Sequence, residues 1–189
     1  MIILGIDPGS ITTGYAFLKA EKGKVDVLEY GVFHAKATLP VEDRLLQIVT
    51  ELEARLDVYH PEALAMEGVF FAKNAKSALV LGHIRGAILV ACRRRGMSFS
   101  EYPPKIVKQA VTGDGSAAKE QVANMVFARL GIEHSELPLD ASDALAIAWT
   151  HANPAPLAVA LKGRPVHRKK KACVSEWKAL VEKMGGTIQ

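Results

Sequence analysis

The first six residues of the chain form an almost wholly apolar run, and an acid, Asp7, follows it at once. A continuous apolar run of this length predicts a strand buried on both faces, as in the centre of a sheet that helices cover on each side. Pro8, Gly9 and Ser10 then predict a turn. The Asp7 carboxylate therefore lies at an edge of the core, where its charge is costly unless another group compensates it.

The remaining pattern predicts one α/β domain. Three strands in hairpin succession come first, and helices then alternate with strands, which favours a mixed sheet flanked by helices. We expect strands at residues 2–7, 13–20, 25–35, 63–68 and 98–102. We expect helices at residues 41–58, 74–95, about 104–111, 117–130 and 140–152. Hydrophobic residues make up 49% of the 189, enough for one well-buried domain, which we place at residues 1–153.

Residues 154–189 are expected to form a basic tail. The net charge of the chain is +4, and residues 155–189 hold eight Lys and Arg against two acidic residues. Ser175 is a candidate cap for a short amphipathic helix that carries Trp177. A solvated linker with a docked helix and an extra contact to DNA or to a partner both fit this composition.

Several classes of protein do not fit the sequence. No uncharged apolar run is long enough to cross a bilayer. A secretory signal begins with basic residues, and the run before Asp7 has none. We therefore expect no membrane partner. The two cysteines, Cys92 and Cys173, lie in unlike contexts, which favours free thiols in a reducing cytoplasm. Histidines and cysteines show no zinc spacing, and there is no Walker-type phosphate loop.

Four carboxylates lie where a two-metal nuclease would need them. Glu67 ends a second apolar run, as Asp7 ends the first. Asp140 and Asp143 are three residues apart, which places both on one face of a helix. Each acid alone has a plain explanation as a turn, strand-end or helix-cap residue. Together they predict a site for two Mg²⁺ ions that supports phosphodiester hydrolysis by an activated water.

A second set of residues is suited to contact nucleic acid. Phe70 follows Glu67 closely and is a candidate to stack on an unpaired base, although a place in the core explains it equally well. Lys105, Lys108 and Lys119 flank a glycine-rich loop at residues 113–116. They are candidate phosphate contacts, together with the helix start near Ala117, and the alternative is a solvated surface.

These motifs together carry a family resemblance across residues 1–153. The matching stretches are Ile2 with residues 4–10, residues 13–15, 66–75 and 107–111 with Gly113, Gly115, Ser116 and Lys119, and residues 140–146. They occur in family order and at family-like spacing. The chain resembles the RuvC family of bacterial Holliday-junction resolvases, in the ribonuclease H-like superfamily.

The resemblance implies a ribonuclease H-like five-stranded mixed sheet flanked by helices. It implies that the four acids are metal-binding and catalytic, that Phe70 approaches the junction crossover, and that Lys108 and Lys119 face the DNA. It also implies Mg²⁺, with Mn²⁺ as a substitute, and a role in DNA recombination and repair. The family acts as a homodimer that nicks two opposing strands of a four-way junction symmetrically, and it works with the RuvA–RuvB branch-migration complex.

The helix at residues 74–95 supports a homodimer separately. Its apolar residues are spread too widely for one face, and Gly82 and Gly86, one turn apart, would let another backbone come close. A two-fold enzyme also suits a substrate that is cut twice. The tail is the departure, because residues 155–189 extend beyond the resemblance.

Two other functions are weighed against the resolvase. A junction-binding module without catalysis would be expected to lack an acid, yet all four are present. An actin-like or sugar-kinase ATPase also begins with an apolar strand and an Asp-x-Gly turn. That class needs further glycine-rich phosphate loops, and none is visible in the sequence.

Overall fold

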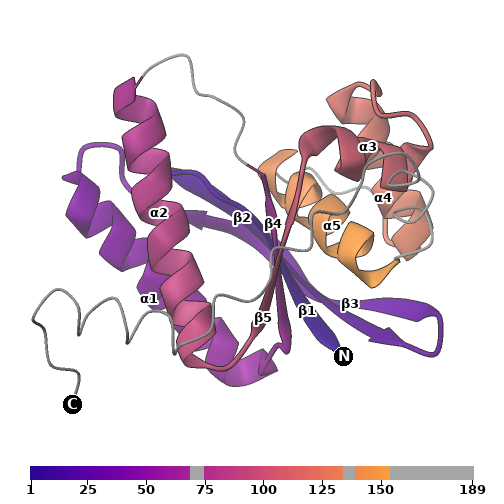
Figure 1. Ribbon diagram of the computed structural model, residues 1–189, viewed down its shortest axis with the longest axis horizontal. Helices are drawn as coiled ribbons and strands as arrows, with labels where there is room; N and C mark the ends of the chain where they lie inside the picture. Colours follow the sequence, from indigo (N-terminus) through magenta and orange to yellow (C-terminus); the bar gives the residue numbers. More distant parts are fainter. Residues whose placement is uncertain (69–74, 134–138, 154–189) are drawn as a thin grey trace, which may run out of the picture.

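A computed structural model describes residues 1–68, 75–133 and 139–153 of the chain. Its five strands form one sheet in the order β3-β2-β1-β4-β5 (Figure 1). The strands are β1 (Ile2–Asp7), β2 (Thr12–Glu21), β3 (Lys24–His34), β4 (Ala63–Glu67) and β5 (Ser98–Tyr102). The first three pair antiparallel, while β4 pairs parallel with both β1 and β5. The expected five-stranded mixed sheet is therefore confirmed.

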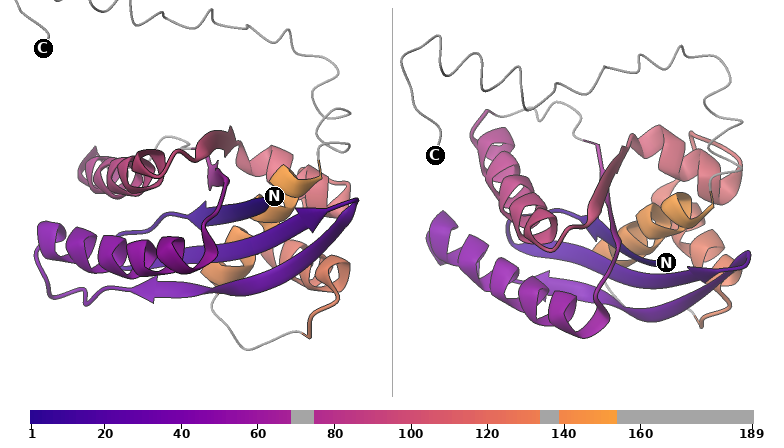
Figure 2. Two further views of the ribbon diagram at one scale, coloured as in Figure 1. Left: turned by 90° about the horizontal axis from the view of Figure 1, so that it is seen from below. Right: turned by 60° about the horizontal axis from the view of Figure 1, so that its bottom comes forward.

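Helices cover both faces of the sheet (Figures 1 and 2). One face carries α1 (Val41–Tyr59) and α2 (Ala75–Arg94). The other carries α3 (Pro104–Thr112), α4 (Lys119–Leu130) and α5 (Leu139–Ala152). Side chains alternate along β1, so Ile3 packs with the second group while Leu4 and Ile6 pack with the first. The N-terminal strand is central and buried on both faces, as its unbroken apolar run predicts.

Helix α5 lies directly on β1 and β2, and two glycines make this possible. A Cβ atom on Gly14 would lie 1.9 Å from the carbonyl oxygen of Asp140. A Cβ atom on Gly5 would lie 2.3 Å from the carbonyl oxygen of Ala144. Because neither strand has a side chain at these points, the helix backbone rests against the sheet, and its first turns lie beside the end of β1.

Helix α4 begins two residues later than the sequence pattern indicates. Ala117 is buried, and Ala118 has an extended backbone that stands just before the helix. The side chain of Gln121 accepts a hydrogen bond from the Ala118 N–H at 2.9 Å, which closes the first turn. Alanine fits a helix as well as it fits this buried turn, so composition alone does not place the boundary.

Helix α2 is, in the part of the chain that the structure describes, the one helix long and apolar enough to cross a membrane by length and composition. Its apolar residues divide between two faces. Ile84 and Ile88 are buried against the sheet and α1, whereas Leu79 and Val90 are 61% and 59% exposed. Part of its apolar character therefore belongs to the core, and the rest faces outward. The proposed tail at residues 154–189 lies outside the described residues.

Candidate metal centre

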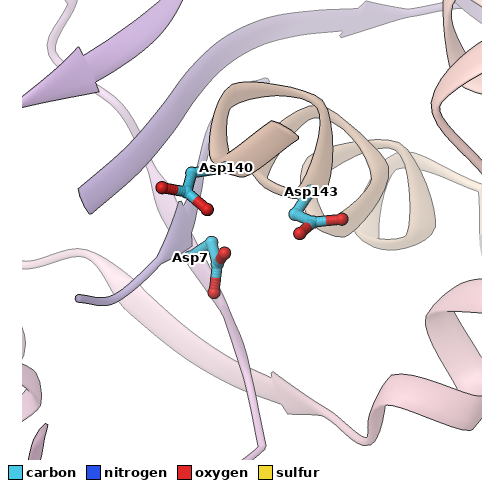
Figure 3. Close-up of side chains that lie close together, drawn as sticks. All are labelled: Asp7, Asp140 and Asp143. Atoms are coloured by element: carbon cyan, nitrogen blue, oxygen red, sulfur yellow. The ribbon is translucent and has the colours of Figure 1, made fainter. Parts of the chain in front are cut away.

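Three aspartates meet at the edge of the sheet where β1 ends (Figure 3). Asp7 is the last residue of β1, and Asp140 and Asp143 lie one turn apart at the start of α5. One carboxylate oxygen from each lies within 4.8 Å of the other two. A cation with oxygen ligands at about 2.0–2.6 Å would fit among them. Asp140 lies inside the first turn of α5, so it is not merely a residue that precedes the helix.

Glu67 reaches the same edge because β4 runs parallel to β1 and ends beside it. With Asp7 and Asp143 it lines a pocket of about 310 Å³. Glu67 is not part of the group of three aspartates, and Asp140 does not line this pocket. Asp7 and Asp143 are thus the two acids common to both arrangements. All four predicted acids are brought to one edge of the fold.

Burial and neighbouring carboxylates raise the pKa values of Asp7 and Glu67. Burial, followed by the charges of Asp143, Glu67 and Asp140, raises the pKa of Asp7 to about 7. Burial and then the charge of Asp143 also raise the pKa of Glu67. Without added positive charge, the ionised forms of Asp7 and Glu67 are therefore disfavoured, even with Lys119 nearby. The site is therefore electrostatically suited to cations, and its hard oxygen donors fit a divalent metal ion.

Two of the predicted lysines lie at this pocket. The Lys119 ammonium donates to Oδ2 of Asp143 at 2.7 Å, and this bond raises the pKa of Lys119. Lys108 donates to the carbonyl oxygen of Ala117 at 2.7 Å. Both lysines line the pocket with the acids. The sequence placed them near DNA, and the structure also brings Lys119 into direct contact with a predicted metal ligand.

Of the other two predicted DNA contacts, the structure describes Lys105 alone. Lys105 is exposed and does not line the acid pocket, and its side chain lies against Gly115 in the loop after α3. Phe70 lies outside the described residues.

Sequence reasoning missed two residues that bond the backbone next to the candidate metal ligands. Arg85, on α2, donates to the backbone carbonyl of Glu67 and pairs with Glu101 on β5. Thr13 is buried, and its hydroxyl donates to the carbonyl of Gly9 at 2.6 Å, which fixes the turn after β1. The available signal was chemical: an arginine inside an apolar helix and a threonine inside an apolar strand each need a polar partner.

The mixed sheet with its strand order, the helices on both faces and the acids at one edge define the class, a ribonuclease H-like fold with a candidate metal centre. The family profile described as crossover junction endodeoxyribonuclease RuvC matches residues 3–151. The chain belongs to this family, as the sequence motifs predict.

Curated relatives agree with this assignment. The crossover junction endodeoxyribonuclease RuvC of Chlorobaculum parvum is 43% identical over 149 residues, which cover 79% of this chain and 80% of that protein. The RuvC protein of Ruminiclostridium cellulolyticum is 44% identical over 153 residues, covering 81% and 92%. The similarity thus extends over most of each protein.

Solved structures give the same result for the fold. Thermus thermophilus RuvC in complex with a Holliday junction substrate is similar with a TM-score of 0.77 and 36% identity, covering 84% of this chain and 96% of that one. The yeast mitochondrial Holliday junction resolvase Ydc2 has a TM-score of 0.59 at 15% identity, which shows a shared fold alone. The expected ribonuclease H-like fold is confirmed. The roles of individual residues stay predictions.

Proposed function

We propose that this chain is a metal-dependent endodeoxyribonuclease that resolves four-way DNA junctions by paired symmetrical nicks. The observation that carries the proposal is the meeting of Asp7, Asp140 and Asp143, with Glu67 in the adjoining pocket, in a member of the RuvC family. The exposed location of this edge lets a phosphodiester approach the acids from outside.

The four acids would divide two Mg²⁺ ions between them. Asp7 and Asp143 belong to both arrangements of acids, so Asp7 would be suited to serve both ions, together with Asp143, Glu67 and Asp140. When bound, the two ions neutralise charge on the phosphate and lower the pKa of an attacking water, and Mn²⁺ is expected to substitute. The chain's own part is to hold these oxygens in place from three separate elements.

Lys119 has two roles in this proposal. In the absence of cations its ammonium offsets the charge of Asp143. Because the same ammonium lines the pocket, Lys119 is also placed to contact a DNA phosphate there, with or without cations. Lys108 lines the same pocket, and Lys105 and Phe70 are proposed as further DNA contacts.

Lys119→Ala is expected to weaken metal-free junction binding and to lower the slope of log K against log salt by about 0.9, the value for one lost phosphate contact. Fluorescence anisotropy over a salt series measures both. Lys24→Ala is the matched control, because Lys24 is exposed at the turn that joins β2 to β3. If the slope of log K against log salt equals that of Lys24→Ala, Lys119 does not contact a DNA phosphate.

The primary experiment incubates the purified protein with synthetic four-way junctions and linear duplexes, with and without Mg²⁺. Binding in both conditions and cutting of the junction only with Mg²⁺ are expected. Binding without cutting in either condition would favour the junction-binding module. ATP hydrolysis at a rate that DNA does not change would favour the actin-like or sugar-kinase ATPase.

A homodimer is proposed through the outward face of α2. Leu79, Gly82, His83, Gly86 and Val90 share one exposed stripe of this helix. Within residues 1–68, 75–133 and 139–153, no atom lies within 4 Å of a Cβ atom built on either glycine, so a second copy could approach the helix backbone there. An apolar stripe with small residues on a single helix is suited to a two-fold contact with itself.

Val90→Glu is expected to separate the dimer, because it places two like charges at the two-fold contact. Sedimentation should then show a monomer, and junctions should receive single nicks in place of paired ones. Val58→Glu is the control, since Val58 is 69% exposed on α1. A dimer that survives Val90→Glu unchanged would place the subunit contact elsewhere.

The proposal also includes a cellular setting. We expect a cytoplasmic protein that acts in DNA recombination and repair alongside a RuvA–RuvB branch-migration complex. The family supports this setting, and a free, buried Cys92 is compatible with a reducing compartment. Co-purification of the chain with the RuvA–RuvB complex on junction DNA would test the partner.

A further inference from the structure

A second pocket lies on the other side of the turn that follows Asp7. Its volume is about 370 Å³, and it shares no lining residue with the acid pocket. It is formed where the β1–β2 turn, α1 and the beginning of α2 meet, and its lining residues are Ser10, Arg44, Lys76, Ser77, Val80 and Leu81. Among the described residues no acid lines it, and both charged residues of that lining, Arg44 and Lys76, are positive.

Arg44 is incompletely bonded in this pocket. Its Nη1 donates to the carbonyl oxygen of Ser10 at 3.2 Å and lies 3.3 Å from the Ser10 hydroxyl. Its Nε is buried with no hydrogen-bond partner among the described residues. The half-buried Arg55 and Arg85 each pair with a carboxylate, whereas Arg44 has none within 4.0 Å in the described part of the chain. A partly buried guanidinium without an anion is unfavourable.

The surroundings suit an anion with several oxygens. Lys76 supplies a second positive charge, and Ser77 and Ser10 supply hydroxyl groups at the rim of the pocket. A guanidinium, an ammonium and hydroxyls are the groups that proteins use to hold the phosphates of a nucleic-acid backbone. The two apolar residues, Val80 and Leu81, form the α2 wall and offer no competing charge.

We propose that this pocket binds one backbone phosphate of the DNA strand that is led to the acids. The inference rests on the proposed nuclease function and names a contact that the four acids and Lys119 do not provide. Arg44 bonds Ser10, three residues after Asp7, and the Thr13 hydroxyl bonds Gly9 within the same turn. A phosphate held at Arg44 would therefore fix the DNA strand relative to the turn that directly follows Asp7, a proposed metal ligand.

Two substitutions test the site through metal-free junction binding over a salt series. Lys76→Gln is expected to weaken binding and to lower the salt slope by about 0.9, because it removes one phosphate charge contact. Arg44→Lys keeps the charge but loses the planar fork, so affinity should fall several-fold with a nearly unchanged slope. Lys24→Gln is the control. If both variants behave like the control, the pocket does not bind DNA.

A junction with single methylphosphonate linkages, which are uncharged, locates the phosphate. One linkage near the cut is expected to weaken binding by the wild type but to weaken Lys76→Gln no further. If no position of the linkage weakens wild-type binding without also weakening binding by Lys76→Gln, the proposal is wrong. If inorganic phosphate raises the melting temperature of the wild type but not of Lys76→Gln, while DNA binding is equal, the pocket belongs to free phosphate instead.

The same assays separate this inference from the proposed function. A wild type that neither binds junctions nor nicks them with Mg²⁺ contradicts the nuclease itself. A wild type that does both, beside variants that match Lys24→Gln, contradicts the phosphate pocket alone. Lys76 is exposed, so its replacement is expected to leave the fold intact even if Arg44→Lys is destabilising. Sedimentation of the variants must show the wild-type oligomer; a change would assign the pocket to the subunit contact and overturn the DNA contact.

Discussion

Asp7→Asn is expected to lower junction cleavage by more than about 10³-fold and to leave metal-free junction binding close to that of the wild type. The large loss is expected because Asp7 belongs to both arrangements of acids, and even residues that only support a metal ligand cost about 10–100-fold when replaced. Single-turnover cleavage and anisotropy measure the two quantities. Cutting at near the wild-type rate would show that the site is assigned to the wrong residues.

The same substitution should stabilise the metal-free protein above neutral pH. The pKa of Asp7 is about 7 in the folded chain against a usual value of 3.8. Between these two pH values the folded state keeps the proton of Asp7, whereas the unfolded state has lost it. Stability of the wild type therefore falls as pH rises from about 4 to 7, by at most about 4 kcal/mol from this group. In Asp7→Asn this loss of stability with rising pH is expected to be absent.

Urea unfolding at several pH values, with a chelator present, tests this second effect. Saturating Mg²⁺ is the internal control, because bound cations are expected to remove the repulsion and to make the wild type the more stable protein. Asp26→Asn, at an exposed position on β3, should show neither change. Equal pH dependence in the wild type and Asp7→Asn would contradict the electrostatic account.

Gly14→Ala should destabilise the fold by more than about 3 kcal/mol, because the added Cβ atom would lie 1.9 Å from the carbonyl oxygen of Asp140. Either α5 lifts from the sheet or β2 shifts. Whatever folded protein remains should bind Mn²⁺ more weakly, since Asp140 moves away from Asp7. Urea unfolding and metal titration measure the two effects.

Gly82→Ala provides the comparison for this prediction. Gly82 lies in α2, and no atom of the described residues is within 4 Å of its Cβ position, so within one subunit the same added methyl group is expected to be tolerated or slightly stabilising. Because Gly82 also lies on the proposed dimer stripe, both glycine variants are compared in the Val90→Glu background, which is expected to be monomeric. A Gly14→Ala protein with wild-type stability and metal affinity would show that α5 does not depend on this close approach.

Much of the fold is predictable from the sequence because it follows from local patterns. The apolar run that ends at Asp7 predicts a central strand, and the hairpin strands and helices follow from periodicity and turn residues. The four acids are recognisable because each ends a strand or begins a helix. The parallel pairing of β1 and β4 then brings two of them to one edge.

The remaining features depend on contacts between distant segments. The local sequence does not show that the backbone of α5 packs against Gly14, because this contact exists only once the helix and β2 touch. The bond from Lys119 to Asp143 and the bond from Arg85 to the carbonyl of Glu67 are likewise tertiary. Such pairings need coordinates, since residue type alone allows many partners.

The order in which the chain is synthesised gives the layout of the acids a protective consequence. Asp7 emerges from the ribosome near the beginning, whereas Asp140 and Asp143 follow after almost the whole of the sheet. No nascent segment that ends before α5 can bring these oxygens together, because they meet only when α5 docks on β1 and β2. A nascent chain that has not yet reached α5 therefore lacks the proposed metal centre.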